Sequence, residues 1–208
     1  MNDKIELFNI FFLDWDDSLF STGFILSNNI DISNENDIEE YKLYFIELDE
    51  LISNLLMSLD KKGYVFIVTN ANIKWVEKCL KILPITKNVI DEKNIQIISA
   101  RDRYKSTKML KDWKTYTFKD VIKDMMNEVD DNDIVNIISL GDAKYEYNGL
   151  LSLDDYFKIN YSDRMYLLKS INFIKNPSFD QILEQLKVMN KSYNEIINKI
   201  DYIDFNFE

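Results

Sequence analysis

Three carboxylates within four residues follow an apolar segment near the start of the chain. Residues 7–13 are mostly apolar and rich in aromatic side chains, which is typical of a buried strand. Asp14, Asp16 and Asp17 come directly after this segment, and Ser18 follows them. Carboxylates at a strand end repel one another and lose hydration, so a cation or a phosphorylated partner is needed to offset the cost. Mg²⁺ suits such a position because it prefers hard oxygen ligands.

Polar side chains also follow two later apolar segments. Thr69 and Asn70 come after one of them, and Gly141 and Asp142 come after the other. Glu146 stands four residues beyond Asp142. If both segments are strands of a parallel sheet, their carboxyl ends meet at the edge where such sheets bind ligands. The sequence then predicts one site that combines carboxylates, a hydroxyl group and an amide.

The elements that position these residues alternate between strands and helices. The sequence predicts strands at residues 7–13, 64–68, 94–99, 134–140 and within 165–173, and helices at about 37–61, 72–82, 117–129 and 179–199. A polar loop is expected at about 21–36 and an irregular charged segment at 100–114. This alternation predicts an α/β domain whose mostly parallel sheet is covered by helices on both faces.

The predicted site has the parts that phosphoryl transfer requires. One carboxylate can attack phosphorus and become an acyl phosphate. A second, two residues later, can protonate the leaving oxygen and then activate water. A metal held by the first carboxylate and a distant one shields the nucleophile from the negative substrate. Thr69 and Lys114, which stands just before predicted helix 117–129, can hold the oxygens of the transferred group.

These motifs resemble those of haloacid-dehalogenase-like (HAD) phosphohydrolases. In order along the chain they read Phe12-Leu13-Asp14-Trp15-Asp16-Asp17-Ser18, Val65-Phe66-Ile67-Val68-Thr69-Asn70, Trp113-Lys114 and Leu140-Gly141-Asp142-Ala143-Lys144-Tyr145-Glu146. The resemblance spans roughly residues 7–146 and extends to an uncharacterised subgroup with an Asp-Trp-Asp-Asp-Thr motif. Two positions depart from the common pattern, because Ser18 replaces a threonine and Glu146 replaces an aspartate.

The resemblance implies a role for each of these residues. Asp14 would be the nucleophile and Asp16 the general acid and base. The phosphate ligands would be Thr69, Asn70 and Lys114. Magnesium would be held by Asp14, the backbone carbonyl of Asp16, and Asp142, with Ser18, Gly141 and Glu146 in support.

The resemblance also implies a single HAD-like domain over 1–208. Its three-layer Rossmann-like core would have the strand order 5-4-1-2-3. We expect it to be capless or minimally capped, with a small flap at about 18–36 and a C-terminal strand–helix extension at about 165–208. An open site favours a bulky or macromolecular phosphate ester.

Several residues have a simpler structural interpretation. Asp17 is expected to shape a turn, and Thr69 could serve as the N-cap of the next helix. Arg101 could contact substrate or pair with a surface acid. Trp15 and Trp75 are expected to pack in the interior.

The lysine assignment has competitors, because Lys105, Lys108 and Lys111 lie close to Lys114 in the sequence. The position just ahead of a helix favours Lys114. A response-regulator receiver also combines acids, threonine and lysine at a sheet edge. The chain does not fit that order, since the third predicted strand ends in Ser99-Ala100 and lacks a phosphoacceptor.

Composition excludes several functional classes. The chain of 208 residues has a formal net charge of −11, which disfavours nucleic acid as a partner but leaves room for a local basic patch. It contains no histidine, so histidine-dependent catalysis and histidine metal sites are absent. A lone cysteine, Cys79, and the lack of a signal-peptide pattern or a long apolar run predict a cytoplasmic protein without a membrane anchor.

The sequence therefore predicts a magnesium-dependent phosphomonoester hydrolase that acts through an aspartyl-phosphate intermediate. One alternative is a HAD-type phosphotransferase or mutase, which would pass its phosphate to an acceptor other than water. The other is a non-catalytic phosphate-binding module of the same fold. The sequence does not specify an oligomeric state.

Overall fold

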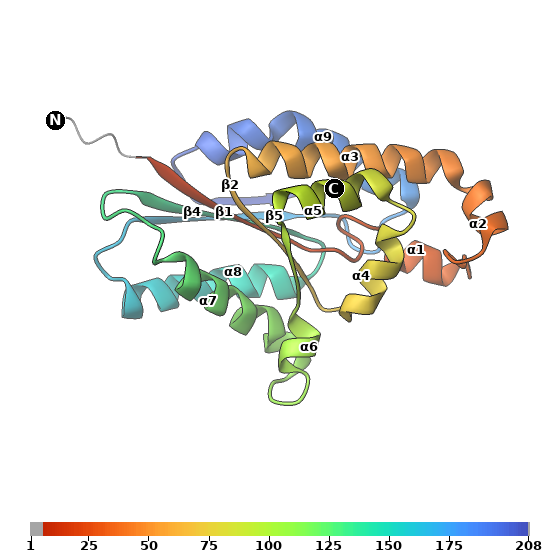
Figure 1. Ribbon diagram of the computed structural model, residues 1–208. Helices are drawn as coiled ribbons and strands as arrows, with labels where there is room; N and C mark the ends of the chain where they lie inside the picture. Colours follow the sequence, from red (N-terminus) through yellow and green to blue (C-terminus); the bar gives the residue numbers. More distant parts are fainter. Residues whose placement is uncertain (1–5, 208) are drawn as a thin grey trace.

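The computed structural model describes residues 6–207, and residues 1–5 and 208 of the expected domain lie outside it (Figure 1). The strands are β1 (Leu7–Leu13), β2 (Gly63–Thr69), β3 (Gln96–Ser99), β4 (Ile134–Gly141), β5 (Tyr166–Asn172) and β6 (Ile203–Asn206). The helices are α1 (Thr22–Ser27), α2 (Glu35–Glu40), α3 (Lys42–Asp60), α4 (Ile73–Leu80), α5 (Pro84–Lys93), α6 (Ala100–Tyr104), α7 (Trp113–Met125), α8 (Lys144–Asn160) and α9 (Phe179–Asn198), with a 3₁₀ turn at Leu110–Asp112. This is the predicted Rossmann-like α/β architecture.

The described strands form one sheet in the order β3-β2-β1-β4-β5-β6, and every neighbouring pair is parallel. This order differs from the five-strand order that the resemblance implies, because β6 pairs with β5 and lengthens the sheet. Read from the β5 side, the other five strands follow the sequence 5-4-1-2-3. The C-terminal segment is therefore part of the sheet and of the helix layer, where α9 packs on α3.

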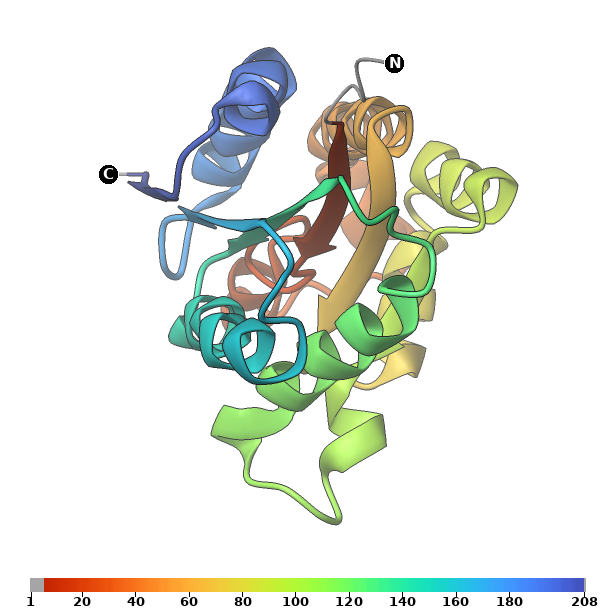
Figure 2. The same cartoon turned by 90° about the vertical axis from the view of Figure 1, so that its left-hand side faces the viewer.

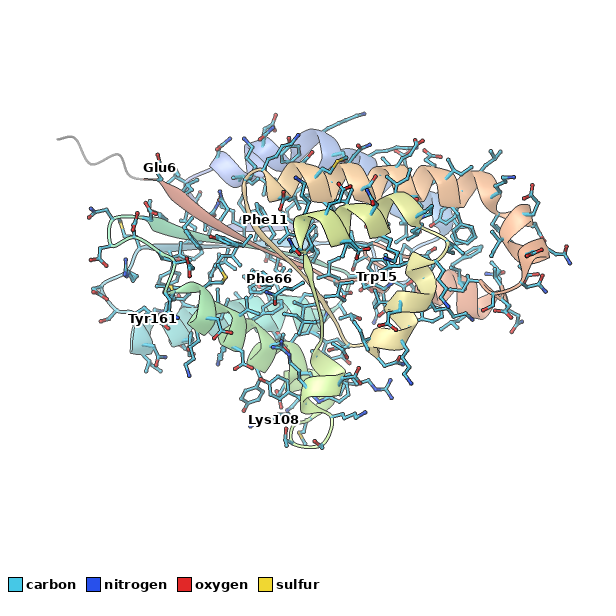
Figure 3. All side chains as sticks on the ribbon, viewed as in Figure 1. Glu6, Phe11, Trp15, Phe66, Lys108 and Tyr161 are labelled. Atoms are coloured by element: carbon cyan, nitrogen blue, oxygen red, sulfur yellow. The ribbon has the colours of Figure 1, made fainter. Side chains whose placement is uncertain are left out.

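Alternating side chains of the strands face two different helix layers. Phe11 and Leu13 pack in the core under α3, α5 and α9, whereas Ile10 and Phe12 pack in the core under α7 and α8. Figure 2 shows the layers on opposite sides of the sheet, and in Figure 3 the side chains fill the space between ribbons around the labelled Phe11 and Phe66. The pleat reverses direction at each residue, so Asp14, the residue after Leu13, belongs on the α7 and α8 side.

Several helices lie where the sequence analysis predicts none. The expected flap contains α1, the segment after Pro84 forms α5, and the residues after Asp142 form the long helix α8. Helix α5 starts at its proline, because a proline at the first helical position replaces an N–H group that has no partner there. Helix α7 begins at Trp113, so Lys114 lies in its first turn. The predicted position of Lys114 ahead of the helix is therefore wrong.

Within the described part of the chain, no helix is long and apolar enough to cross a membrane.

Candidate phosphoryl-transfer site

Asp14 is held at the carboxyl end of β1 by residues from three other segments. Its backbone N–H donates to the carbonyl of Leu140 at the end of β4, at 2.9 Å. The ammonium of Lys114 contacts Oδ1, and the Ser18 hydroxyl donates to Oδ2 at 3.1 Å. The side chain of Asp14 is only 6% exposed. The structure therefore brings Asp14, Ser18 and Lys114 together, as predicted.

Lys114 also joins Asp14 to Glu146. The ammonium contacts a Glu146 carboxylate oxygen as well, and the Lys114 side chain is 1% exposed. Lys114 comes from the first turn of α7 and Glu146 from the first turn of α8. Both helices cover the face of the sheet toward which the pleat directs Asp14. The two adjacent helices thus bring a carboxylate and an ammonium group to one strand end.

Three carboxylates of this cluster could hold a metal ion. Each of Asp14, Asp142 and Glu146 offers an oxygen, and these oxygens lie within 4.8 Å of one another. Against these three negative charges Lys114 supplies one positive charge, so a formal excess of two negative charges remains. A divalent cation would balance this excess, and an all-oxygen set suits Mg²⁺. The donor set therefore fits the expected metal, with Glu146 in the group itself although the resemblance gives it only a supporting role.

The electrostatics of the cluster reflect burial and crowding. Burial raises the pKa of Asp14 well above its usual value, and the nearby ammonium of Lys114 opposes that shift. The pKa of Asp142 rises to about 7, chiefly through burial and secondarily through Glu146. Burial disfavours the charge on Lys114, yet Asp14 and Glu146 together raise its pKa above the usual lysine value. A positive ion beside the carboxylates would favour their ionised forms.

Asp16 is oriented by three hydrogen-bond donors. The Thr69 hydroxyl donates to Oδ2 at 2.9 Å, and on Oδ1 the Thr22 hydroxyl donates at 2.6 Å and the Trp75 indole at 2.9 Å. Thr69 in turn accepts the backbone N–H of Ala71 at 2.9 Å. The second carboxylate of the first motif and the threonine of the second motif therefore meet at the sheet edge, as expected.

Two of these donors lie outside the predicted site. Thr22 begins the unpredicted helix α1, and Trp75 is expected only to pack in the interior. Helical periodicity predicts the helix that carries Trp75, but it does not indicate that its indole nitrogen faces a carboxylate 59 residues earlier. No pattern in the sequence could have identified either contact.

Asn70 lies beside Thr69 with unused hydrogen-bonding capacity. Its amide oxygen and nitrogen are shielded from solvent and have no partner in the described structure. An unpaired buried polar group costs free energy, so a ligand oxygen that reaches this amide would recover part of it. This position is compatible with the predicted role of Asn70 as a phosphate ligand.

Gly141 allows Glu146 to approach the end of β4. A Cβ atom at position 141 would lie 2.3 Å from Cγ of Glu146, far inside normal contact. The other Glu146 carboxylate oxygen, Oε2, accepts the backbone N–H of Ala143 at 3.0 Å and so fixes the side chain over the first turn of α8. Glycine at 141 is therefore required by the close passage of Glu146.

The competing lysines lie elsewhere. Lys105 pairs with Asp102 at 3.7 Å, and Lys108 stacks on the ring of Tyr116 at the loop after α6, where Figure 3 labels it. No bond to the site is formed by Lys111 within the described residues. The lysine that reaches Asp14 is Lys114. Asp17 lies in the turn predicted for it, with a left-handed φ of 55°, and accepts the backbone N–H of Gly23 at 2.7 Å.

Comparisons of the chain with family models, with curated proteins and with solved structures give no match. Membership of the HAD family therefore stays a prediction from the motifs.

Proposed function

We propose that the protein is a magnesium-dependent phosphomonoester hydrolase of the HAD type. The observation that carries the proposal is the pairing of two differently held aspartates at one sheet edge. Asp14 contacts an ammonium and lies in a cluster fit for a metal ion, whereas Asp16, two residues on, accepts hydrogen bonds from the neutral side chains of Thr22, Thr69 and Trp75. The charged surroundings of Asp14 suit a nucleophile, and Asp16, held two residues away by other donors, is placed to carry the proton.

In the proposed reaction a carboxylate oxygen of Asp14 attacks phosphorus, and the bond from phosphorus to the ester oxygen breaks. Asp16 donates its proton to that leaving oxygen. Asp16 then takes a proton from water, the water oxygen attacks phosphorus, and the acyl-phosphate bond breaks to release phosphate and regenerate Asp14. Lys114 and Asn70 offer donors to the transferring oxygens. A magnesium ion, held by Asp14, Asp142 and Glu146, would neutralise negative charge on the nucleophile and the phosphoryl group.

The proposal is tested by hydrolysis of an aryl phosphate with and without Mg²⁺. We expect metal-dependent turnover and a hydroxylamine-sensitive phosphoenzyme in the wild type. Asp14→Asn should lower kcat by at least about 10⁴-fold, and Asp16→Asn by about 10²- to 10⁴-fold, since each removes a group that bonds to reacting atoms.

Asp49→Asn is the matched control. Asp49 is also a buried aspartate, but it caps α5 by accepting the N–H groups of Ile85 and Thr86 at 2.9 and 2.7 Å. Its loss should affect stability and leave turnover within a few-fold of the wild type. Absence of turnover and of phosphoenzyme from a broad panel of esters would refute the proposal. A phosphoenzyme that transfers its phosphate only to an alcohol would indicate a phosphotransferase instead.

A further inference from the structure

A recess of about 410 Å³ opens beside Asp16. We call this cavity the Asp16 recess. Its lining includes Asp16, Asn70, Trp75 and Arg101. In the proposed reaction Asp16 protonates the leaving oxygen, so the remainder of the leaving group must start from this side of the site. A larger recess of about 700 Å³ is lined by Asp142 and by residues of β5 and β6, but Asp16 does not line it. The Asp16 recess is therefore the cavity that we expect the leaving group to occupy.

Arg101 is fixed to the recess by its backbone. It lies in the short helix α6, directly after β3. The Ser99 hydroxyl donates to the carbonyl of Ala71 at 2.7 Å and accepts the N–H of Asp102 at 3.0 Å. These two bonds tie the start of α6 to the Thr69–Ala71 segment. The guanidinium group therefore extends from a backbone that is anchored beside the phosphate-binding residues.

Within residues 6–207 the guanidinium of Arg101 has no hydrogen bond or ion pair, so the expected alternative of pairing with a surface acid is not found there. Its neighbour Asp102 is engaged elsewhere, because its carboxylate accepts the N–H of Ile73 at 3.1 Å and pairs with Lys105. An arginine side chain offers five donors in a planar fork that matches a carboxylate or a phosphate. The recess thus presents an unused, permanently charged anion-binding group.

We infer that the substrate is a phosphomonoester whose leaving group carries a second anionic group, which Arg101 binds. This inference rests on the proposed function and specifies its substrate class. The geometry supports it, because Asp16, the proposed proton donor, and Arg101 line the same recess. The charge of the chain supports it too, since a local cation offsets the repulsion between a protein of net charge −11 and an ester that carries two anionic groups.

The test compares matched aryl phosphates in the presence of Mg²⁺. The substrates are 3-carboxyphenyl phosphate, its neutral isostere 3-carbamoylphenyl phosphate, and the 3-phosphono analogue. We expect the wild type to prefer one or both anionic esters over the carbamoyl ester by about 10-fold in kcat/KM, as a charge-assisted hydrogen bond provides. The phosphono arm determines which kind of anion is favoured. Arg101→Gln should reduce the preference toward 1, and Arg101→Lys should retain part of it.

Arg103→Gln is the matched control, because Arg103 is an exposed arginine two residues away that does not line the recess. It should keep the wild-type preference. Equal kcat/KM for anionic and neutral esters in the wild type, or a preference that survives in Arg101→Gln, would overturn the inference and leave the proposed function intact. If the wild type hydrolyses an unsubstituted aryl phosphate but none of these three esters, the inference also fails and the proposed function stands. Absence of turnover and of phosphoenzyme across the broad panel of esters refutes the proposed function itself.

Discussion

Among the described residues, two lysines are buried almost completely, and their surroundings are opposite. Lys114 is 1% exposed and contacts the carboxylates of Asp14 and Glu146. Lys169, on β5, is 0% exposed and donates to the backbone carbonyls of Ile196 and Ile197, both at 2.8 Å. The first lysine stands at the carboxyl edge of the sheet among acids, and the second stands under the last turn of α9.

The partners decide what each buried ammonium does. Charged partners raise the pKa of Lys114 despite its burial, whereas burial, with a smaller effect of Lys199, lowers the pKa of Lys169 to about 8. Lys169 and Asn136, which donates to the Ile197 carbonyl at 3.1 Å, satisfy carbonyl groups that the end of a helix leaves unpaired. Lys169 therefore has a structural role, and Lys114 belongs to the acidic cluster of the proposed site. Burial alone does not distinguish the two roles.

The largest expected difference between the two lysines is in activity. Lys114→Met should lower kcat/KM by about 10³-fold or more, because in the proposed reaction Lys114 donates to the transferring oxygens. It should also destabilise the fold by about 3–5 kcal/mol, since two buried carboxylates lose their partner. Lys169→Met should keep kcat/KM within about threefold. Steady-state kinetics corrected for the folded fraction measure the first effect, and urea unfolding measures the second. Equal activity losses in the two variants would show that the two buried lysines do not differ in role.

A smaller effect is expected in the response of stability to metal. Mg²⁺ at about 100 times its Kd should stabilise the wild type by about 2.7 kcal/mol, because the ion binds the folded state. Lys169→Met should respond equally, since its site carboxylates are unchanged. Asp142→Asn should respond much less, because one of the three candidate ligands is lost. Thermal melting with and without Mg²⁺ provides the measurement, with Ca²⁺ as a second ion. A full response in Asp142→Asn would exclude Asp142 as a ligand.

The smallest expected effect is a pH dependence specific to Lys169. Its folded pKa of about 8 lies below the value of about 10.4 for an unfolded lysine. Between these values the unfolded chain binds more protons, so this residue makes stability rise with pH from about 8 to about 10, and the contribution is lost as pH falls through 8. The difference in unfolding free energy between the wild type and Lys169→Met, measured across this range, should therefore change in favour of the wild type as pH rises. A difference independent of pH would contradict the lowered pKa.

Local patterns in the sequence predicted most of the sheet. The aromatic and β-branched segments became β1, β2, β4 and β5, because burial on both faces requires continuous apolar runs. Strand β6 was not predicted, since it is short and carries Asp204 and Asn206 among its few residues. It forms by pairing with β5, and Asn172 of β5 bonds to both of those side chains. The amphipathic signal of α8 was also missed, because Gly149 and several polar residues interrupt its apolar positions.

The alternating α/β plan and the meeting of polar residues at the strand ends could be predicted from the sequence, because both follow from periodicity and from the common direction of parallel strands. The tertiary structure decided which lysine reaches Asp14 across 100 residues, which neutral donors hold Asp16, and that Glu146 joins the acidic cluster. It also decided that Lys169, in a strand whose sequence gives no sign of this role, donates to the carbonyl groups at the end of α9. Such choices depend on how helices pack on the sheet, which spacing along the chain does not encode.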